Sequence, residues 1–224
     1  MEISFLSILA FGLVLGFKHA IEPDHIIAVS TIASRSKKLS RSSLAGVFWG
    51  IGHTATLFIV CILLILMKGE IPEKWAMSLE FLVGIMLVYL GITSILSFRN
   101  HRLHQHDHGD GEHKHQHQDI SYLKSMIIGL VHGLAGSAAM VLLTMSTVKN
   151  IWEGAFYILI FGIGTVIGML SFTTIIGIPF VLSAKKINIH KMLSQVTGFI
   201  STAFGVYYMY NLGVTEGLFK LWIQ

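Results

Sequence analysis

The feature that most constrains this chain is a series of apolar stretches, each about as long as a membrane crossing. A helix needs about 20 mostly apolar residues to span a bilayer. Of the 224 residues, 53% are hydrophobic and only 12% are Asp, Glu, Lys or Arg, about half the charged share of a soluble domain. The sequence therefore predicts an all-α membrane protein with six transmembrane helices, at residues 3–33, 43–67, 75–97, 121–147, 151–183 and 192–212.

The first and fifth stretches are longer than one crossing needs, and each contains a proline. Pro23 interrupts the first stretch, and Pro179 follows Gly177 in the fifth. Proline removes a backbone donor and bends or ends a helix. A broken helix survives inside a membrane only where it is buried in protein or lines a polar cavity. We expect both spans to be bent or broken.

A weak internal repeat divides the chain into halves. Gly16 and His19 recur 113 residues later as Gly129 and His132, and two further glycine groups recur at offsets of 112 and 114. Each half holds three spans, an odd number, so the halves must face opposite ways, as in inverted-repeat transporters. The expected parts are a first three-helix repeat, a His-rich loop, a second three-helix repeat and a C-terminal tail, at residues 1–97, 98–120, 121–212 and 213–224.

The basic residues predict an orientation. Eleven of the sixteen Lys and Arg residues fall in three links on one side, at 34–43, 98–124 and 184–191. The positive-inside rule places these links in the cytoplasm and both termini outside it. We therefore expect an integral protein of the cell's cytoplasmic membrane. The net charge of +4 is explained by this asymmetry, so a nucleic-acid partner is not expected.

The stretch GFKHAIEPDHIIAVS, residues 16–30, places ionisable side chains near the middle of the first span. Each costs roughly 2.5–3.5 kcal/mol there on insertion scales. Its ionisable residues are Lys18, His19, Glu22, Asp24 and His25. On a regular helix they could not converge on one ion, but a kink at a proline would let the segment wrap. Imidazole with carboxylate suits Ni²⁺, Co²⁺, Zn²⁺ or Fe²⁺; a buried ion-pair network that fixes the kink is the alternative.

Lys18 lies four residues before Glu22, a spacing that favours an ion pair. This pair would take Glu22 away from the metal and leave His19, Asp24 and His25 as the first ligands, with Lys18 in an ion-pair or gating role. Glu22 remains a further candidate ligand.

Two more histidines lie in apolar spans beside glycines that permit close helix approach. His53 lies in FWGIGHTATLF, and His132 lies in IIGLVHGLAGSAAMVLL. Small residues at these positions let helices pack closely in a membrane. We interpret both histidines as further metal ligands or relays; the alternative is that each is a hydrogen-bonded packing residue.

The link at 101–117 contains seven of the twelve histidines. Several imidazoles on a flexible polar segment give exchangeable coordination of a divalent metal. This predicts an auxiliary metal-binding loop, while a solvated linker is the alternative. The candidate ligands are His101, His104, His106, His108, His113, His115 and His117.

The motif KHAIEPDHI matches the His-x4-Asp-His pattern of the nickel/cobalt transporter family, through His19, Asp24 and His25. WGIGHT and GLVHGLAGSAAM resemble stretches of its shorter members, the UreH-like, urease-accessory-type nickel permeases. The resemblance implies secondary transport of Ni²⁺ or Co²⁺, usually uptake, with the first motif central to recognition. The longer members have eight spans and acidic motifs in later helices that this chain lacks. Glu22-Pro23 and the His-rich loop are also similar to related nickel/cobalt efflux proteins, so the direction stays open.

The expected function is a secondary transporter that moves a divalent metal through the lipid bilayer, with the metal as substrate and no prosthetic group. A cytoplasmic metallochaperone is the expected protein partner. Export and a non-transporting metal-binding membrane subunit are the alternatives. A thiol or electron carrier is disfavoured because Cys61 is the single cysteine and disulfide exchange uses a pair. No enzyme is expected, because no Ser-His-Asp set, phosphate loop or HExxH motif is present.

Overall fold

The computed structural model describes residues 5–67, 71–96, 121–147 and 150–223, with the backbone alone for 137–147. Every regular element in these ranges is helical. In chain order they are α1 (Phe5–His19), α2 (Pro23–Ala33), α3 (Leu39–Met67), α4 (Glu73–Leu96), α5 (Tyr122–Thr147), α6 (Ile151–Ser183), α7 (Ile187–Tyr210), the π-helical turn η2 (Asn211–Thr215) and α8 (Leu218–Ile223). The prediction of an all-α protein is confirmed, and the helices follow the predicted stretches closely.

Among the described helices, α3, α4 and α6 are each long and apolar enough to cross a membrane. The pair α1 and α2 qualifies as a fourth crossing when it is joined across its 57° bend. Large apolar side chains lie exposed on the outside of the helices, as lipid contact requires, for example Leu6, Ile59, Leu182 and Phe199. The chain is thus an integral membrane protein in which three or four helices are long and apolar enough to cross the membrane. Six crossings remain a prediction.

The expected break in the fifth span is wrong, whereas the break in the first is confirmed. Pro179 lies inside α6, which continues without interruption to Ser183. The helix is held against α3 in the turn before this proline, because Gly177 packs on Ser42 and Thr174 hydrogen-bonds Ser43 at 2.7 Å. Membrane helices tolerate proline where neighbouring helices support them in this way.

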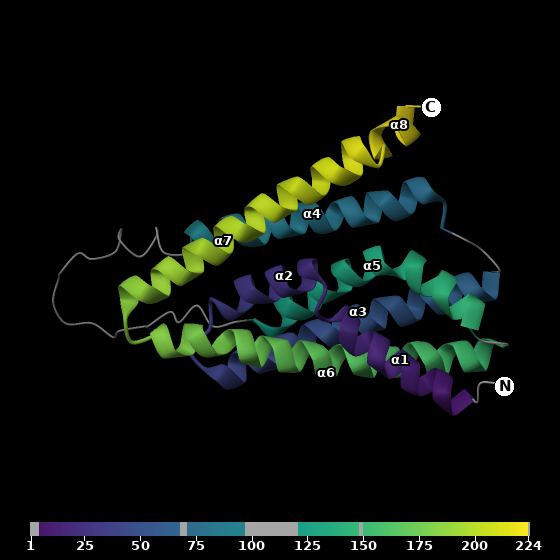
Figure 1. The fold of residues 1–224 in the computed structure, drawn as a ribbon, viewed down its shortest axis with the longest axis horizontal. Coiled ribbons are helices and arrows are strands. Elements are labelled where there is room, and N and C mark those ends of the chain that lie inside the picture. The colour runs from purple at the N-terminus through teal and green to yellow at the C-terminus, as the bar shows by residue number, and fades with distance from the viewer. Residues whose placement is uncertain (1–4, 68–70, 97–120, 148–149, 224) are drawn as a thin grey trace.

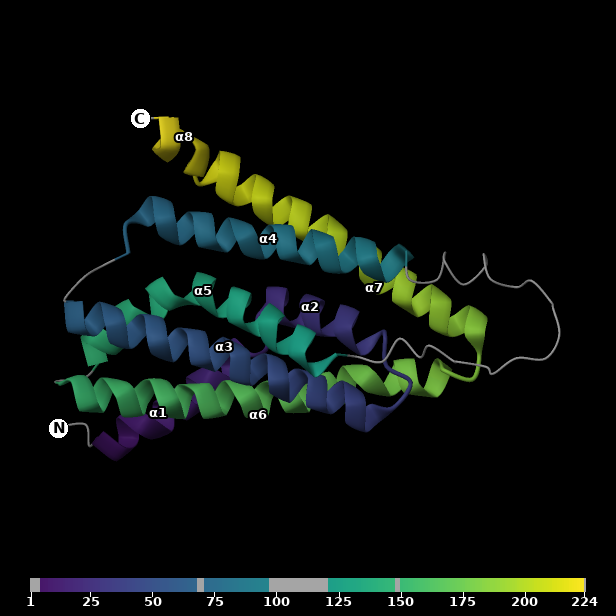
Figure 2. The ribbon, with the colours of Figure 1, turned by 180° about the vertical axis from the view of Figure 1, so that it is seen from behind.

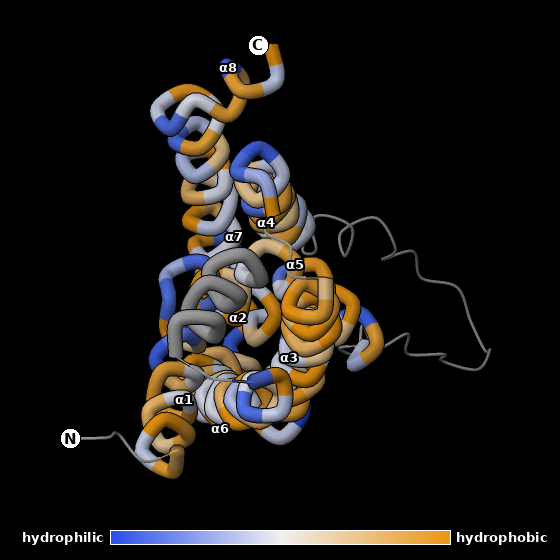
Figure 3. Tube along the Cα trace, turned by 90° about the vertical axis from the view of Figure 1, so that its right-hand side faces the viewer, coloured by the Kyte–Doolittle hydropathy of each residue, from blue (hydrophilic) through white to orange (hydrophobic). Residues whose placement is uncertain are grey.

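The helices form two groups. α3 packs against α5 and α6, and α1 packs along α6, whereas α4 pairs with α7 on one side of the molecule (Figures 1 and 2). α2 lies between the two groups and contacts α4, α6 and α7; the end-on view in Figure 3 places it at the centre. The start of α1 and the helix α8 lie at the same end of the molecule, on opposite sides of it, and the α2–α3 and α6–α7 turns lie at the other end (Figure 1). The basic links at 34–43 and 184–191 therefore share one end of the molecule.

Glycines set the closest helix approaches, and the two halves use them in the same way. A Cβ atom at Gly16 in α1 would clash with the carbonyl oxygen of Phe161 in α6. A Cβ atom at Gly129 in α5 would clash with the carbonyl oxygen of Trp49 in α3. These four positions correspond at offsets of 113 and 112. The α1–α6 contact therefore has its counterpart in the α5–α3 contact.

The contact between α4 and α7 also depends on glycines that pack against backbone carbonyls of the other helix. Gly84 packs on the carbonyl of Gly205, and Gly91 packs on the carbonyl of Gly198. Position numbers rise along one helix as they fall along the other, so the two helices run antiparallel.

Candidate metal site

The first span breaks where its ionisable residues are concentrated. α1 ends at His19, α2 begins at Pro23, and the two helix axes differ by 57°. The Glu22 amide donates to the carbonyl of His19 at 3.1 Å, which closes the turn. Proline is well suited to the first position of α2 because the missing N–H would be unpaired there in any helix. The chain thus changes direction at this turn while the amides of Ile21 and Glu22 stay hydrogen-bonded.

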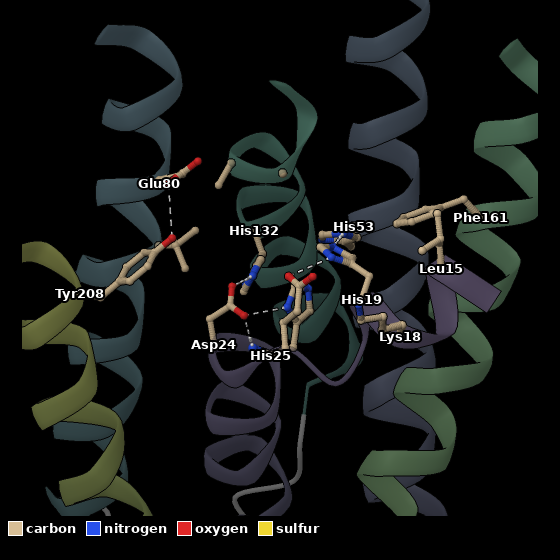
Figure 4. A pocket seen from close by; sticks show the side chains of 14 residues that line it. Leu15, Lys18, His19, Asp24, His25, His53, Glu80, His132, Phe161 and Tyr208 are labelled. Carbon is tan, nitrogen blue, oxygen red and sulfur yellow. Dashed lines mark hydrogen bonds and ion pairs between the residues drawn. The ribbon is translucent and has the colours of Figure 1, made fainter. Parts of the chain in front are cut away.

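The break brings together side chains that a regular helix would hold apart. The Nε2 atoms of His19 and His53 lie 3.1 Å apart, and the Nε2 atom of His132 lies 2.9 Å from Oδ2 of Asp24. The other oxygen of Asp24 lies 3.1 Å from Nδ1 of His25 (Figure 4). α1, α2, α3 and α5 therefore each contribute to one cluster, which we call the His/Asp cluster: His19, Asp24, His25, His53 and His132.

The floor of the cluster is buried, and some of its nitrogens lack partners. His25, His53 and His132 are at most 2% exposed. Among the described residues, Nε2 of His25 and Nδ1 of both His53 and His132 have no hydrogen-bond partner. Buried polar atoms are nearly always paired, and an unpaired one costs about 1–3 kcal/mol. These buried nitrogens are available to a ligand.

Two sets of three ligand atoms meet the spacing of a metal site. The sets are His19, His25 and His53, and Asp24, His25 and His132; within each set the ligand atoms lie within 4.8 Å of one another. Adjacent nitrogens bound to one ion at about 2.1 Å are about 3 Å apart, which is the separation of His19 and His53. The two sets have His25 in common.

Glu22 orients the cluster from its edge. Its Oε2 atom lies 3.0 Å from Nδ1 of His19, and its side chain is 51% exposed. Ligating histidines commonly give their second N–H to a carboxylate, which directs the free nitrogen to the metal. The expected ion pair of Lys18 with Glu22 is replaced by this contact. Lys18 itself lines the cavity beside the cluster.

Helix ends add to the electrostatics of the cluster. Asp24 lies in the first turn of α2, where the backbone N–H of His25 donates to its Oδ1 atom at 2.9 Å. The N-terminus of a helix carries partial positive charge, and the C-terminus, where His19 ends α1, carries partial negative charge. The broken span thus stabilises an ionised Asp24 and presents the negative end of α1 to a cation.

The cluster lies at the inner end of a cavity of about 340 Å³. Two of its lining residues were missed by the sequence reasoning: Glu80 from α4 and Tyr208 from α7. The Tyr208 hydroxyl donates to Oε2 of Glu80 at 3.5 Å (Figure 4). An acidic residue within an apolar span is a functional candidate by itself, and this signal was present at position 80. The indole of Trp49 also borders the cluster, stacked on His25 at 6.0 Å with 11° between ring planes.

The seven histidines of the predicted auxiliary loop lie outside the described residues. Their metal-binding role remains a prediction from composition.

These features define the class: a polytopic integral membrane protein whose first span breaks at a buried His/Asp cluster. Residues 7–207 match the model of a family described as the cytochrome c biogenesis protein transmembrane region. The chain is 65% identical to the urease accessory protein UreH of Bacillus sp. (strain TB-90), over 100% of this chain and 99% of that protein. The chain therefore belongs to this transmembrane family and, within it, to the UreH-like proteins.

More distant relatives have other names. The chain is 29% identical to the "Putative nickel/cobalt efflux system MJ1092" of Methanocaldococcus jannaschii, over 87% of this chain and 88% of that protein. It is 25% identical to the chloroplast protein FOR GROWTH AND FERTILITY 1 of Arabidopsis thaliana, over 87% of this chain and 56% of that protein. No solved structure matches the chain.

Proposed function

We propose that this protein is a secondary transporter for a divalent transition metal, Ni²⁺ or Co²⁺ in the first place, working in the direction of uptake. The observation that carries the proposal is the convergence of four imidazoles and one carboxylate on one cavity at a break in a membrane span. Such groups are expensive in a membrane and are retained there for a function. The names of the UreH and efflux-system relatives support a metal cargo.

The ligand chemistry narrows the cargo to borderline divalent ions. Neutral imidazole suits Ni²⁺, Co²⁺, Zn²⁺ and Fe²⁺, and one carboxylate adds charge without favouring Ca²⁺ or Mg²⁺, which require more oxygen ligands. Histidine must be neutral to bind metal, so binding releases protons and flux can couple to a proton gradient. Metal uptake should then respond to an imposed pH gradient, and uptake that ignores such a gradient would remove this coupling from the proposal.

An inverted repeat would supply the alternating access that transport requires. α3 and α6 occupy equivalent places in the two halves, and they run antiparallel: Gly46 faces Thr173, and Thr54 contacts Gly162. The matched glycine contacts at Gly16 and Gly129 support the same relation. We place the cargo site between two opposed halves, as in other inverted-repeat transporters.

The proposed orientation places the basic links in the cytoplasm and both termini outside. On this assignment the His-rich loop lies in the cytoplasm, where it would collect arriving metal and pass it to a metallochaperone. It is an auxiliary site, because exchangeable imidazoles do not set a fixed geometry.

Export is the second candidate, because a relative that aligns over most of this chain is named as an efflux system. In that case the His-rich loop would load the cavity from the cytoplasm. Cell-associated nickel in cells with and without the protein separates the two directions by the sign of the difference.

Reconstitution tests the function itself. Liposomes that contain the purified protein should take up Ni²⁺. The degree to which excess Co²⁺, Zn²⁺ or Mn²⁺ inhibits this uptake should rank the competing ions. His19→Ala and His25→Ala should each abolish flux while the protein remains monodisperse. His190→Ala is a matched control: this buried histidine lies in α7 beside Ser183, away from the cavity lining. Metal binding without flux by the wild-type protein would instead favour a non-transporting subunit.

A further inference from the structure

The cavity has a rim and a floor that differ in chemistry. The floor carries the buried imidazoles, whereas Lys18 and Glu22 at the rim are exposed and Glu80 is half-buried. Glu80 and Tyr208 come from the α4–α7 pair, on the opposite side of the cavity from Phe161 (Figure 4). One carboxylate therefore faces the cluster from the other helix group.

The far end of the α4–α7 pair is closed. Ser94 in α4 lies 3.2 Å from the hydroxyl of Ser34 at the end of α2, and donates to the carbonyl of Ser194 in α7 at 3.1 Å. Ser194 in turn donates to the carbonyl of Ser34 at 3.3 Å. We call this the serine junction: Ser34, Ser94 and Ser194. All three are at most 1% exposed.

The serine junction fixes where Glu80 lies relative to the cluster. Asp24 lies in the first turn of α2 and Ser34 directly follows its last residue, and α4 runs alongside from Glu80 to Ser94. Glu80 is four residues further from the junction than Asp24 is, which is one helical turn, or about 6 Å. Glu80 thus lies beyond Asp24 on the side away from the closed end, toward the chain termini.

We infer that Glu80, held by Tyr208, is an outer carboxylate station that a divalent cation meets before it reaches the His/Asp cluster. The inference rests on the proposed function and adds a residue and an access side to it. A half-buried carboxylate opposite Asp24 attracts a dication into the cavity, and the unpartnered Nε2 of His25 gives it a ligand deeper inside. Charge also favours this role: with the cation bound, its two positive charges and Lys18 balance Glu22, Asp24 and Glu80, whereas without Glu80 the lining of the cavity keeps one net positive charge.

The test is the initial rate of Ni²⁺ uptake into proteoliposomes as a function of Ni²⁺ concentration. Carboxylates that focus a cation into a cleft act on capture, so Glu80→Gln should raise KM about tenfold and leave kcat within about twofold. Glu80→Asp should restore most of the affinity, and Tyr208→Phe should give an intermediate KM. High salt should reduce the difference between wild type and Glu80→Gln, because it screens the rim charge.

Glu73→Gln is the matched control, since Glu73 lies in the first turn of the same helix and does not line the cavity. It should leave KM unchanged. A wild-type KM for Glu80→Gln, or a loss of kcat at unchanged KM, would overturn the outer station. A wild-type protein that moves no nickel would instead overturn the proposed function, so the two failures are distinguishable.

Discussion

At the scale of single residues, the cluster depends on groups that are poor choices for stability. Nδ1 of His53 is buried without a partner among the described residues, and its Nε2 faces His19 at 3.1 Å. Proteins often give up stability at functional sites in this way. A residue that lowers the stability of the fold, as His53 does, is therefore a direct sign of a functional site.

The variant His53→Leu should separate the effect of this residue on stability from its effect on metal binding. Leucine has nearly the volume of histidine and removes the buried, unpaired Nδ1 atom. The Nε2 atom of His19 loses its partner, but this side chain is 16% exposed at the cavity, so the metal-free protein should gain about 1 kcal/mol in stability. The same change removes a ligand, so added Ni²⁺ should no longer raise the thermal midpoint of unfolding. Thermal unfolding of wild type and variant, with and without Ni²⁺, measures both effects. A variant that is less stable than wild type and still stabilised by Ni²⁺ would contradict the role of His53.

At the same scale, the sequence predicted the residues of the cluster but not all of its surroundings. His19, Asp24 and His25 were predictable because five ionisable groups beside one proline are costly in an apolar span. Glu80 and Tyr208 were not assigned, since their place at the cavity depends on how the α4–α7 pair docks. Likewise Glu22 contacts His19 and not Lys18, because α1 ends between them and the i,i+4 spacing of a helix no longer applies.

At the scale of helices, apolar length predicted where the elements lie, whereas proline alone did not predict where they break. Pro23 follows charged groups that need a cavity, and the helix breaks there. Pro179 is supported by α3 through Ser42 and Ser43, and α6 continues past it. A helix break in a membrane thus depends on what the neighbouring helices can satisfy.

Matched glycine substitutions test the relation between the halves. Gly16→Ala and Gly129→Ala each place a Cβ against a backbone carbonyl that cannot move easily. Both should lower stability by a similar amount, about 1–3 kcal/mol as for overpacking in a core. Gly136→Ala is the control, since its Cβ would meet its nearest neighbour at an ordinary 3.8 Å. Thermal unfolding in detergent measures all three, and a strong effect at only one of Gly16 and Gly129 would argue against equivalent packing.

At the scale of the whole molecule, the two helix groups meet at the serine junction and separate toward the cavity. If the α4–α7 pair moves against the other helices during the proposed transport, this junction should open while the cavity side closes. The short distance between Ser34 and Ser94 makes the movement testable with a crosslink.

Ser34→Cys with Ser94→Cys, in a Cys61→Ser background, should form a disulfide on oxidation, because the two hydroxyls lie 3.2 Å apart and cysteine sulfurs placed there can bond. The crosslinked protein should lose Ni²⁺ flux and still bind Ni²⁺ at the cavity. Reduction should restore flux, and the oxidised single-cysteine variants serve as controls. Full flux in the crosslinked protein would mean that this junction does not open.

Removal of residues 101–117 belongs to the same scale, since it leaves every described helix in place. We expect a lower capacity for uptake in cells and an unchanged order of competing ions, because the His/Asp cluster sets selectivity. Uptake of competing metals by cells with the shortened protein measures both. Complete loss of flux in liposomes after the deletion would show that the loop belongs to the site.

The stacking of Trp49 on His25 has a practical consequence. Trp49 is fully buried, whereas Trp75, Trp152 and Trp222 are 51%, 75% and 48% exposed. The emission of Trp49 should therefore be the blue-shifted component of the protein's fluorescence. Trp49 also lies within energy-transfer range of any ion bound by the imidazole of His25. Open-shell ions such as Ni²⁺ and Co²⁺ would quench the Trp49 fluorescence, and closed-shell Zn²⁺ would not. The fluorescence of Trp49 should therefore report whether an ion is bound at the His/Asp cluster.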